Sequence, residues 1–374
     1  MRVHIVDPPA FTPPYDHALS AALARAGAAV DLVTSRFAYG PVPPAEGYTV
    51  RELFYGHACG AAGSRTRRVT KLLEHVPDML RYRSRVATEA DVVHFQWLGL
   101  PWVDGRLLPR RPIVVTAHDL LPREPRPAQV AAQRRVYDSA MAVVVHSEYG
   151  RRRLVSELSI DQDKVHVIHH GAFEHLTRLP HEQQLPKSLA RVDVPVVLFF
   201  GLLRPYKGIE TLLAAWRGVD DAELWIVGRP MMPLETLRAG AGPRVRFVPR
   251  FISDAELPAF FRRADVVALP YSRTERFDQS GVLATALAFG KPLVLSNVGG
   301  FAEVADLGAG RLVPPDDPAA LHDALATLVV DPAERARLAA ASEAAAAGPY
   351  SWDEAARKTL ELYRGLGLRH NAPP

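Results

Sequence analysis

Residues 197–216 read VLFFGLLRPYKGIETLLAAW, and this stretch decides the fold expected for the chain. Its first four residues are an apolar run of strand length. Gly201 then allows a sharp turn, because glycine tolerates positive φ. After Gly208, apolar residues recur at helical spacing. The stretch therefore predicts a buried strand, a turn and a helix.

The loop between this strand and this helix carries two cations, Arg204 and Lys207. A helix N-terminus offers unpaired N–H groups and the positive end of a dipole. Together with the two side-chain charges, these groups predict a receptor for phosphate. A solvated loop with incidental charges is the alternative interpretation.

Short apolar runs and helical patterns alternate along the whole chain. Such alternation is typical of a parallel sheet that helices cover on both faces. In the first half, strands are expected at residues 3–6, 30–33, 92–95, 113–116, 142–145 and 165–168. In the second half they are expected at residues 196–200, 223–227, 245–248, 266–269, 293–296 and 310–313.

The length of 374 residues exceeds the usual size of one core, so we expect two doubly wound α/β domains. Residues 177–194 are polar and contain Pro180 and Pro186, which indicates a linker. Ligands of two such domains bind at the carboxyl ends of the strands, in the cleft between the domains. The expected division is a first domain at residues 1–180, a linker at 181–194, a second domain at 195–349, and a C-terminal helix and tail at 350–374. We expect the C-terminal helix to return to the first domain.

The composition is that of an ordinary globular protein, with 48% hydrophobic and 23% charged residues. The first residues run directly into a strand, so we expect no signal peptide. No apolar run reaches the roughly 18 residues needed to cross a bilayer. We therefore expect a cytoplasmic protein. Cys59 is the only cysteine, and no Cys/His cluster has zinc spacing, so no metal site is expected.

The formal net charge is +4, and basic residues gather in the segment Arg65–Arg85 beside several leucines and valines. A basic amphipathic segment fits peripheral contact with an anionic membrane, at the inner face, or with an anionic acceptor. A solvated helix face is the alternative. Basic residues do not alternate with aromatic ones, so we expect no nucleic-acid partner.

A second phosphate-type pattern lies where Gln279, Ser280 and Gly281 open an apolar helix. Glycine at this position allows a ligand to approach unpaired backbone amides. The helix ends at GKP (290–292), and the next strand reaches VGG (298–300). Each piece alone fits simple turn chemistry. Together they indicate a diphosphate-linked small molecule.

These motifs resemble the retaining glycosyltransferases of family 4, which have the GT-B fold of two Rossmann-like domains. The resemblance rests on the opening stretch and the GKP and VGG unit, and it extends over the whole chain. In the first half it covers DVVHFQW (91–97), VVTAHDLLPRE (114–124), VVVHSEYGRRRL (143–154) and VHVIHHGAFEHL (165–176). In the second half it covers FISDAELPAFFRRADVVALP (251–270) and YSWDEAARKTLELYR (350–364).

The resemblance implies a role for each matching residue. Arg204 and Lys207 would hold the donor diphosphate and offset charge on the leaving group. His118 would lie near the transferred sugar; a histidine that only caps a strand end is the alternative. Backbone amides of Gly281 and Val282 would also bind the diphosphate. The remaining donor-site residues implied are Gly201, Gly228, Arg250, Phe251, Gln279 and Ser280.

The chain departs from the family where two glutamates usually bracket the second helix start. Phe277 occupies the place of the first, and Thr285 that of the second, which usually contacts the ribose. Glu275 and Asp278 flank Phe277, and either is a candidate substitute. The sequence resembles a subset of the family with Gln-Ser-Gly at this place.

A second departure is the loop DPPAFTPPYDHAL (7–19), where the family often has Gly-Gly. Four prolines make this loop stiff. Thr12, Tyr15, Asp16 and His17 are candidates to face the acceptor. A rigid turn in which Asp16 caps the helix is the alternative. Trp97 offers an aromatic face for sugar or lipid, with core packing as the other possibility.

The activity implied by the resemblance is transfer of a sugar with retention of configuration and without a metal or cofactor. The donor expected is a UDP-sugar, with GDP- or TDP-sugars as alternatives. The acceptor is a sugar, a lipid-linked glycan or a metabolite. A nucleotide-sugar epimerase and a non-catalytic sugar-nucleotide-binding scaffold remain the alternative functions.

Overall fold

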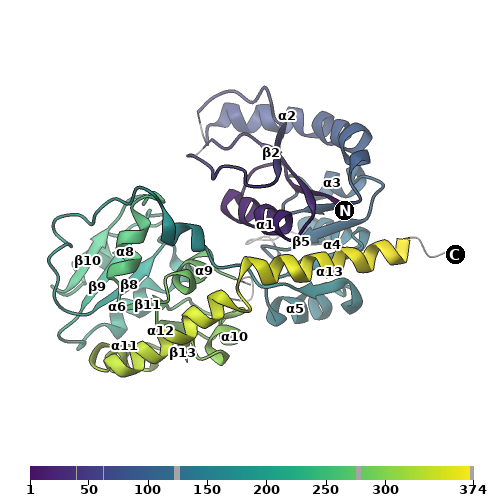
Figure 1. The fold of residues 1–374 in the computed structure, drawn as a ribbon. Helices are drawn as coiled ribbons and strands as arrows, with labels where there is room; N and C mark the ends of the chain where they lie inside the picture. The colour runs from purple at the N-terminus through teal and green to yellow at the C-terminus, as the bar shows by residue number, and fades with distance from the viewer. Residues whose placement is uncertain (39, 62, 122–126, 275–278, 371–374) are drawn as a thin grey trace. The chain divides into compact units, whose positions relative to one another are not determined.

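The computed structural model describes residues 1–38, 40–61, 63–121, 127–274 and 279–370. The chain forms two compact units. Unit 1 contains residues 1–170 and 352–374, and unit 2 contains residues 171–351. Each unit is built on one parallel sheet with helices packed against it (Figure 1). Within the described ranges, no helix is long and apolar enough to span a membrane.

Unit 1 has a seven-stranded sheet in the order β3-β2-β1-β4-β5-β6-β7. Its central strands are buried throughout, which explains their continuous apolar runs. The sequence predicted six of the seven. The strands are β1 (Arg2–Asp7), β2 (Ala29–Ser35), β3 (Thr49–Phe54), β4 (Val92–Phe95), β5 (Ile113–Thr116), β6 (Ala142–Val145) and β7 (Val165–Val167).

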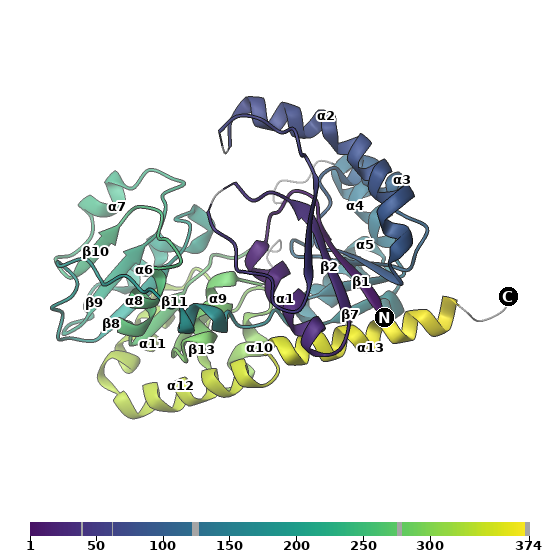
Figure 2. The ribbon, with the colours of Figure 1, turned by 45° about the horizontal axis from the view of Figure 1, so that its top comes forward.

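The C-terminal helix of the chain belongs to unit 1. It packs beside α1 (Figure 2), and the Tyr363 hydroxyl bonds His94 Nδ1 of β4 at 2.6 Å. The expected return of this helix to the first domain is confirmed. The longer helices of the unit are α1 (Pro13–Arg25), α2 (Arg65–Arg81), α3 (Pro101–Leu107), α4 (Pro127–Ser139), α5 (Glu148–Leu158) and α13 (Trp352–His370); short ones are η1 (Tyr82–Val86), η2 (Ala87–Glu89) and η3 (Gln162–Lys164).

Unit 2 has a six-stranded sheet in the order β10-β9-β8-β11-β12-β13. Four of its strands are buried along nearly their whole length. All six strands begin and end where the sequence predicted. They are β8 (Val196–Phe200), β9 (Glu223–Val227), β10 (Val245–Val248), β11 (Val266–Leu269), β12 (Leu293–Ser296) and β13 (Gly310–Val313).

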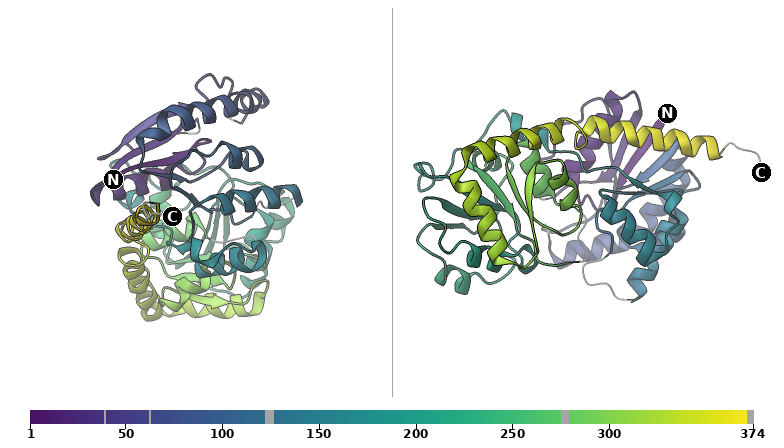
Figure 3. Two further views of the ribbon diagram at one scale, coloured as in Figure 1. Left: turned by 90° about the vertical axis from the view of Figure 1, so that its right-hand side faces the viewer. Right: turned by 90° about the horizontal axis from the view of Figure 1, so that it is seen from below.

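Helices and the segment before β8 complete unit 2. Ala172, Leu176 and Leu189 belong to its core, so residues 171–194 pack in this unit. Helix α11 packs on α6 and β13, and α12 packs on α9 (Figure 3). The helices are η4 (Glu174–Arg178), η5 (Pro205–Lys207), α6 (Ile209–Ala215), α7 (Glu235–Ala239), α8 (Leu257–Arg263), α9 (Gly281–Ala288), α10 (Phe301–Asp306), α11 (Pro318–Val330) and α12 (Pro332–Ala347).

The strand order locates a candidate site in each unit. In an open α/β sheet, ligands bind at the carboxyl ends of the strands where the order reverses. In unit 2 this place lies between β8 and β11, and in unit 1 between β1 and β4. The segments that leave these four strands are therefore the ones to inspect.

Candidate active site

The loop after β8 is held against the end of β9 by a close backbone contact. Gly228 has φ 142°, and a Cβ there would lie 1.7 Å from the Gly201 carbonyl oxygen. The Gly201 N–H donates to the carbonyl of Val227 at 3.0 Å. Only glycine fits at position 228, and the contact fixes where the Arg204–Lys207 segment begins.

Lys207 is buried with 7% of its surface exposed. Its Nζ donates to the Tyr271 hydroxyl at 2.9 Å and lies 4.9 Å from the centre of that ring. The Tyr271 hydroxyl in turn bonds Ser280 Oγ at 3.0 Å. Among the residues that the structure describes, no carboxylate pairs with Lys207. A buried ammonium group without a counter-ion is the expected state of an anion receptor that awaits its ligand.

The N-terminus of α9 lies beside this lysine. A Cβ on Gly201 would lie 3.1 Å from both Lys207 Nζ and Val282 Cγ2, so both groups face the same side of Gly201. Ser280 is the N-cap residue, but its side chain does not cap the helix in the described structure. The structure therefore brings together the lysine and the helix N-terminus that the sequence analysis selected.

Two buried polar atoms of this region have no hydrogen-bond partner within the described ranges: Arg204 Nε and Gln279 Nε2. Buried donors are almost always satisfied in folded proteins. Both are N–H donors from segments that the phosphate patterns selected, so an anionic ligand would satisfy them.

The loop after β10 carries Arg250 and Phe251, which the resemblance placed near the nucleotide base. Arg250 donates to Glu256 at 2.6 Å, and this guanidinium lowers the pKa of the Glu256 carboxyl to about 2. Phe251 is 64% exposed. An exposed ring on a loop fixed by an ion pair is suited to stacking on a base.

The glutamate positions are only partly described. The Thr285 hydroxyl is buried and donates to the Gly281 carbonyl of its own helix at 2.8 Å. Its hydrogen is therefore committed to the helix backbone, and its oxygen is not a charged acceptor like that of a glutamate. Glu275, Phe277 and Asp278 lie outside the described residues.

His118 follows β5 in unit 1, and a series of hydrogen bonds through its ring nitrogens fixes it. His146 Nδ1 bonds the Ile168 carbonyl at 3.0 Å, and His146 Nε2 bonds His118 Nδ1 at 3.1 Å. Since a carbonyl only accepts, Nδ1 of His146 carries hydrogen. In the neutral ring its Nε2 then accepts from His118 Nδ1. The remaining nitrogen of His118, Nε2, lies 3.1 Å from Gln96 Oε1. Since Nε2 carries no hydrogen in this tautomer, the Gln96 amide is assigned the opposite way round, so that its NH₂ group, otherwise buried without a partner in the described residues, donates to Nε2.

Both histidines are electrically neutral near pH 7. Burial lowers the pKa of His118 well below its usual range, and the neighbouring imidazole of His146 lowers it further. Burial likewise lowers the pKa of His146 to about 3. His118 therefore serves as a fixed, uncharged hydrogen-bonding group and not as a cation.

Trp97 and Thr12 join His118 in this cluster. Trp97 stacks on the His118 ring with centroids 5.2 Å apart, and its Nε1 donates to Thr12 Oγ1 at 2.9 Å. Phe11 packs edge-on against Trp97. Of the expected acceptor residues, Trp97 thus lies against His118 and Thr12 against Trp97, while the Tyr15 ring packs edge-on against His118 with centroids 4.6 Å apart.

The other expected acceptor residues, Tyr15, Asp16 and His17, are buried. Asp16 does not cap α1. Instead Asp7, at the end of β1, accepts the N–H groups of Phe11 at 2.7 Å and Thr12 at 3.2 Å. Burial raises the pKa of both the Asp7 and Asp16 carboxyls, and the nearby Asp7 raises that of Asp16 further.

Sequence reasoning missed four residues that shape the two clusters. A shared signal was present, because each is a polar residue at or just beyond the end of a buried strand. Parallel strands bring such residues to one edge of the sheet. The four are Asp7, Gln96, His146 and Tyr271.

One group of three potential metal ligands is found among the described residues: His4, Asp31 and Glu89. Arg51 pairs with Asp31 at 3.0 Å and with Glu89 at 2.9 Å. The guanidinium already balances both carboxylates, so this group is explained as an ion-pair network.

Comparison with known proteins shows the family of the chain. A family model described as Glycosyltransferase Family 4 matches residues 15–172, and one described as Glycosyl transferases group 1 matches residues 194–331. The D-inositol 3-phosphate glycosyltransferase of Corynebacterium efficiens is 30% identical over 331 residues, which cover 79% of this chain and 76% of that protein. The chain belongs to glycosyltransferase family 4. The D-inositol 3-phosphate glycosyltransferase of Xylanimonas cellulosilytica is a second relative of this family 4 enzyme. It is 32% identical, over 75% of this chain and 73% of that protein.

Solved structures show the fold of this glycosyltransferase to be GT-B. Sucrose-phosphate synthase from Thermosynechococcus elongatus matches with a TM-score of 0.76 and 21% identity, over 99% of this chain and all of that one. Anabaena HepE in complex with UDP-glucose matches with a TM-score of 0.70 and 18% identity, over 98% of this chain and all of that one. The expected fold class is confirmed.

Proposed function

We propose that this glycosyltransferase moves a sugar from a UDP-sugar to an acceptor hydroxyl with retention of anomeric configuration. The observation that carries the donor class is the unsatisfied cationic group in unit 2. Among the described residues, Lys207 is buried without a carboxylate, Arg204 Nε is buried without a partner, and no side chain caps α9. A diphosphate supplies what all three groups need.

The reaction breaks the bond between the anomeric carbon and the diphosphate oxygen and forms a bond from that carbon to the acceptor oxygen. In the proposed mechanism, the acceptor attacks from the face that the diphosphate leaves, and a phosphate oxygen takes its proton. Lys207 and Arg204 stabilise the negative charge that grows on the leaving group. His118, neutral and fixed by His146, positions the sugar, and a sugar hydroxyl that hydrogen-bonds its Nε2 takes the place of the Gln96 amide.

Names of similar proteins support a nucleotide-sugar donor. HepE from Anabaena was solved with UDP and with UDP-glucose. The relatives named above are D-inositol 3-phosphate glycosyltransferases. We take UDP as the leaving group of this enzyme, and GDP and TDP as the alternatives to exclude. A role for a metal or another cofactor is not part of the proposal.

The test is the fate of UDP-glucose with and without a panel of acceptors, followed by proton NMR. The proposal expects UDP release that depends on an acceptor and an α-linked product. Turnover of the donor without any acceptor would indicate an epimerase or a hydrolase. Binding of UDP without turnover under any condition would indicate a sugar-nucleotide-binding scaffold.

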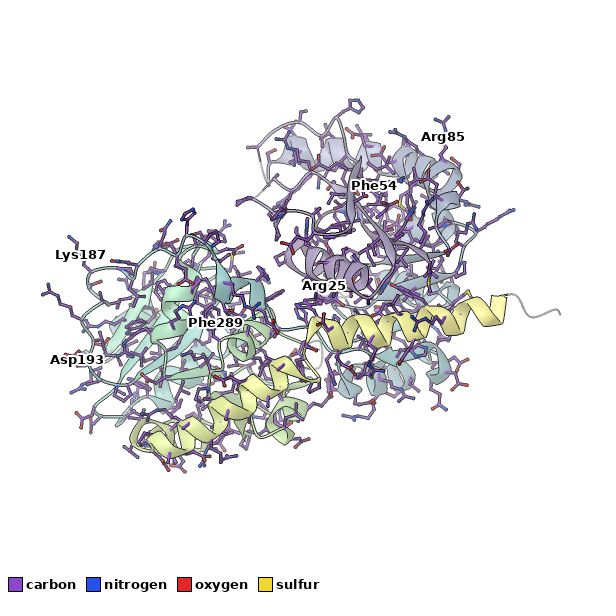
Figure 4. The ribbon with its side chains drawn as sticks, in the orientation of Figure 1. Arg25, Phe54, Arg85, Lys187, Asp193 and Phe289 are labelled. Carbon is purple, nitrogen blue, oxygen red and sulfur yellow. The ribbon has the colours of Figure 1, made fainter. Side chains whose placement is uncertain are left out.

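Lys207→Ala and Arg204→Ala should each reduce transfer strongly. Lys187→Ala is the matched control, because this lysine is exposed on the same unit (Figure 4). Near-normal transfer by both active-site variants would refute the assigned role.

Peripheral membrane contact through the segment Arg65–Arg85 is a second part of the proposal. Helix α2 exposes a row of apolar side chains between its basic residues: Val69, Leu72, Leu73, Val76 and Leu80. Such a face fits an anionic lipid surface. Flotation with vesicles that contain anionic lipid tests it, and Leu73→Ser with Val76→Ser should weaken the binding. Equal binding to neutral vesicles would contradict the electrostatic part.

A further inference from the structure

Unit 1 contains a pocket of about 390 Å³ that the proposed donor site does not use; one of its walls is α2, the helix proposed above for membrane contact. The segments after β1, β2, β3 and β4 line it together with α2, so it opens at the carboxyl edge of the sheet. Its walls include Phe11 of the loop after β1 and Leu100 before α3. The position is that of a ligand site in an open α/β sheet.

Four cations line this pocket: Arg36, Arg67, Arg68 and Lys71. None of the lining residues that the structure describes is acidic. Among the described residues, no carboxylate lies within ion-pair distance of any of the four. The Arg67 guanidinium donates to the Ala58 carbonyl at 3.0 Å, which is a neutral acceptor. Unpaired cations that gather in one concave site attract an anion more strongly than cations spread over a surface.

Lys71 is placed for such a ligand. It is half-buried, its Nζ lies 4.8 Å from the centre of the Tyr55 ring, and it reaches the Pro9 carbonyl at 3.3 Å. Burial and the neighbouring Arg67 lower the pKa of Lys71, and the Asp7 carboxylate offsets this only in part. An added anion would reverse both effects, since it would compensate the buried charge.

A buried relay holds the pocket wall in place. His75 Nε2 bonds Asp104 at 2.6 Å, and His75 Nδ1 bonds the Tyr55 hydroxyl at 2.7 Å. The Asp104 carboxylate accepts from Nε2–H, and in the tautomer with this single hydrogen Nδ1 accepts the tyrosine hydrogen. The Tyr55 oxygen then keeps free lone pairs, which suit a ligand hydroxyl.

Two wall residues have strained backbones. Tyr55 has φ 57° and Ala10 has φ 55°, a conformation that residues other than glycine rarely adopt. The Tyr55 N–H donates to Asp78 at 2.7 Å, which holds the strained residue in position. Strain of this kind gathers at functional sites.

Ring contacts connect the pocket to His118. Phe11 of the pocket wall packs against Trp97 with centroids 5.5 Å apart, and Trp97 stacks on His118. A molecule that anchors a charged group among the four cations would therefore extend toward the residue assigned to the sugar.

We propose that this pocket binds a phosphate group of the acceptor. The inference rests on the proposed function, since it names the class of acceptor. The phosphate belongs either to a small phosphorylated polyol or to a lipid headgroup, and both present the same dianionic group to Arg67, Arg68 and Lys71. The cations select the phosphate, and the Tyr55 oxygen meets a neighbouring hydroxyl.

Calorimetric titration of the full chain tests the proposal, with and without UDP. The probes are D-inositol 3-phosphate, unphosphorylated inositol and inorganic phosphate. The expected result is binding of the two phosphate compounds and none of inositol. Lys71→Gln and Arg67→Gln should each weaken the binding about ten-fold or more, as for loss of a charged hydrogen bond. Arg152→Gln, exposed on α5, is the control and should change nothing.

A vesicle arm separates the two sources of phosphate. Vesicles of phosphatidylcholine with and without phosphatidic acid are offered to the same variants. Binding of the phosphatidic acid vesicles alone, lost in Lys71→Gln and kept in Arg152→Gln, supports the headgroup. If neither free nor lipid phosphate binds in a way that depends on Lys71 and Arg67, the pocket proposal is overturned. Equal binding of inositol and its phosphate overturns it as well.

The UDP titration makes the two failures distinguishable. Loss of UDP binding with intact phosphate binding would overturn the proposed function and leave the pocket. Intact UDP binding without phosphate binding would overturn the pocket proposal and leave the proposed function. Circular dichroism of each variant excludes unfolding as the cause of a lost signal.

Discussion

Replacing Lys207 with methionine separates two effects of the buried charge: the stability that it costs the ligand-free protein and the rate of transfer that it supports. Methionine keeps the length of the side chain and removes the charge. A buried ion costs several kcal/mol in desolvation. Lys207 recovers part of this through its hydrogen bond to Tyr271, about 1.5–3 kcal/mol, and through the ring contact, up to about 2 kcal/mol. Lys207→Met should therefore leave the unfolding free energy of the ligand-free protein unchanged or raise it by up to about 2 kcal/mol.

The same substitution should cost transfer heavily. Loss of one preorganised contact to a developing charge costs about 2.7–4 kcal/mol, or a factor of about 100–1,000 in rate. The assay is kcat/KM for UDP-sugar transfer beside thermal melts with and without UDP. In a unit of this size, 1 kcal/mol shifts Tm by about 2–4 °C. The UDP-free variant should melt at or above the wild-type temperature and gain less from UDP.

Lys187→Met is the control for charge and composition, because Lys187 is exposed. It should change neither the activity nor the melting temperature. The reasoning fails if Lys207→Met transfers sugar at a near-normal rate. It also fails if the empty variant loses about 3 kcal/mol or more, as when one partner of a buried ion pair is removed, since Lys207 would then be a structural residue.

Three further predictions concern the supporting residues. Gly228→Ala should destabilise the protein by about 1–3 kcal/mol in urea unfolding. Gly218→Ala is the control, because Gly218 has φ 81° but a Cβ there would meet no atom closer than 3.7 Å, and it should cost less stability. Equal losses of stability in the two variants would refute the argument that the close contact requires glycine at position 228. His146→Phe should slow transfer about ten-fold by releasing His118 while UDP titration stays unchanged; unchanged kinetics would contradict the positioning role. The pKa of Glu256 is lowered to about 2 in the folded protein, below its unfolded value near 4.3. The ionised carboxylate therefore stabilises the fold above the unfolded pKa, and this stability is lost as pH falls toward about 2. Glu256→Gln should lower the unfolding free energy more at pH 6 than at pH 2, and an equal change at both would refute this linkage.

Strands of unit 2 were predictable because most of them are buried along nearly their whole length. A strand such as β9 (ELWIV) reads as an apolar run between polar turns, and its bounds follow from that contrast. The edge strand β3 (TVRELF) is different, since only Phe54 is fully buried. Its charged residues conceal the pattern, and the sequence analysis missed it. The short helices α3 and α7 were not predicted either, because neither is long enough to show a repeated helical spacing of apolar residues.

The candidate site divides in the same way. Arg204, Lys207 and Gly281 were predictable because glycine and cations at strand ends have a direct chemical meaning. Tyr271 was missed, because its importance depends on a lysine 64 positions away. The pocket in unit 1 was missed for the same reason, since it joins Tyr55, Lys71 and the loop after β1. Only sheet pairing brings such segments together.

The most direct test of the central claim is the thermal shift produced by nucleoside diphosphates. A ligand that binds only the native state at 100 times its Kd stabilises it by about 2.7 kcal/mol. Of UDP, GDP, TDP and ADP, the account predicts that UDP raises the melting temperature most, and that Arg204→Gln combined with Lys207→Met abolishes this shift. No shift with any of the four, or an equal shift in the double variant, would contradict it.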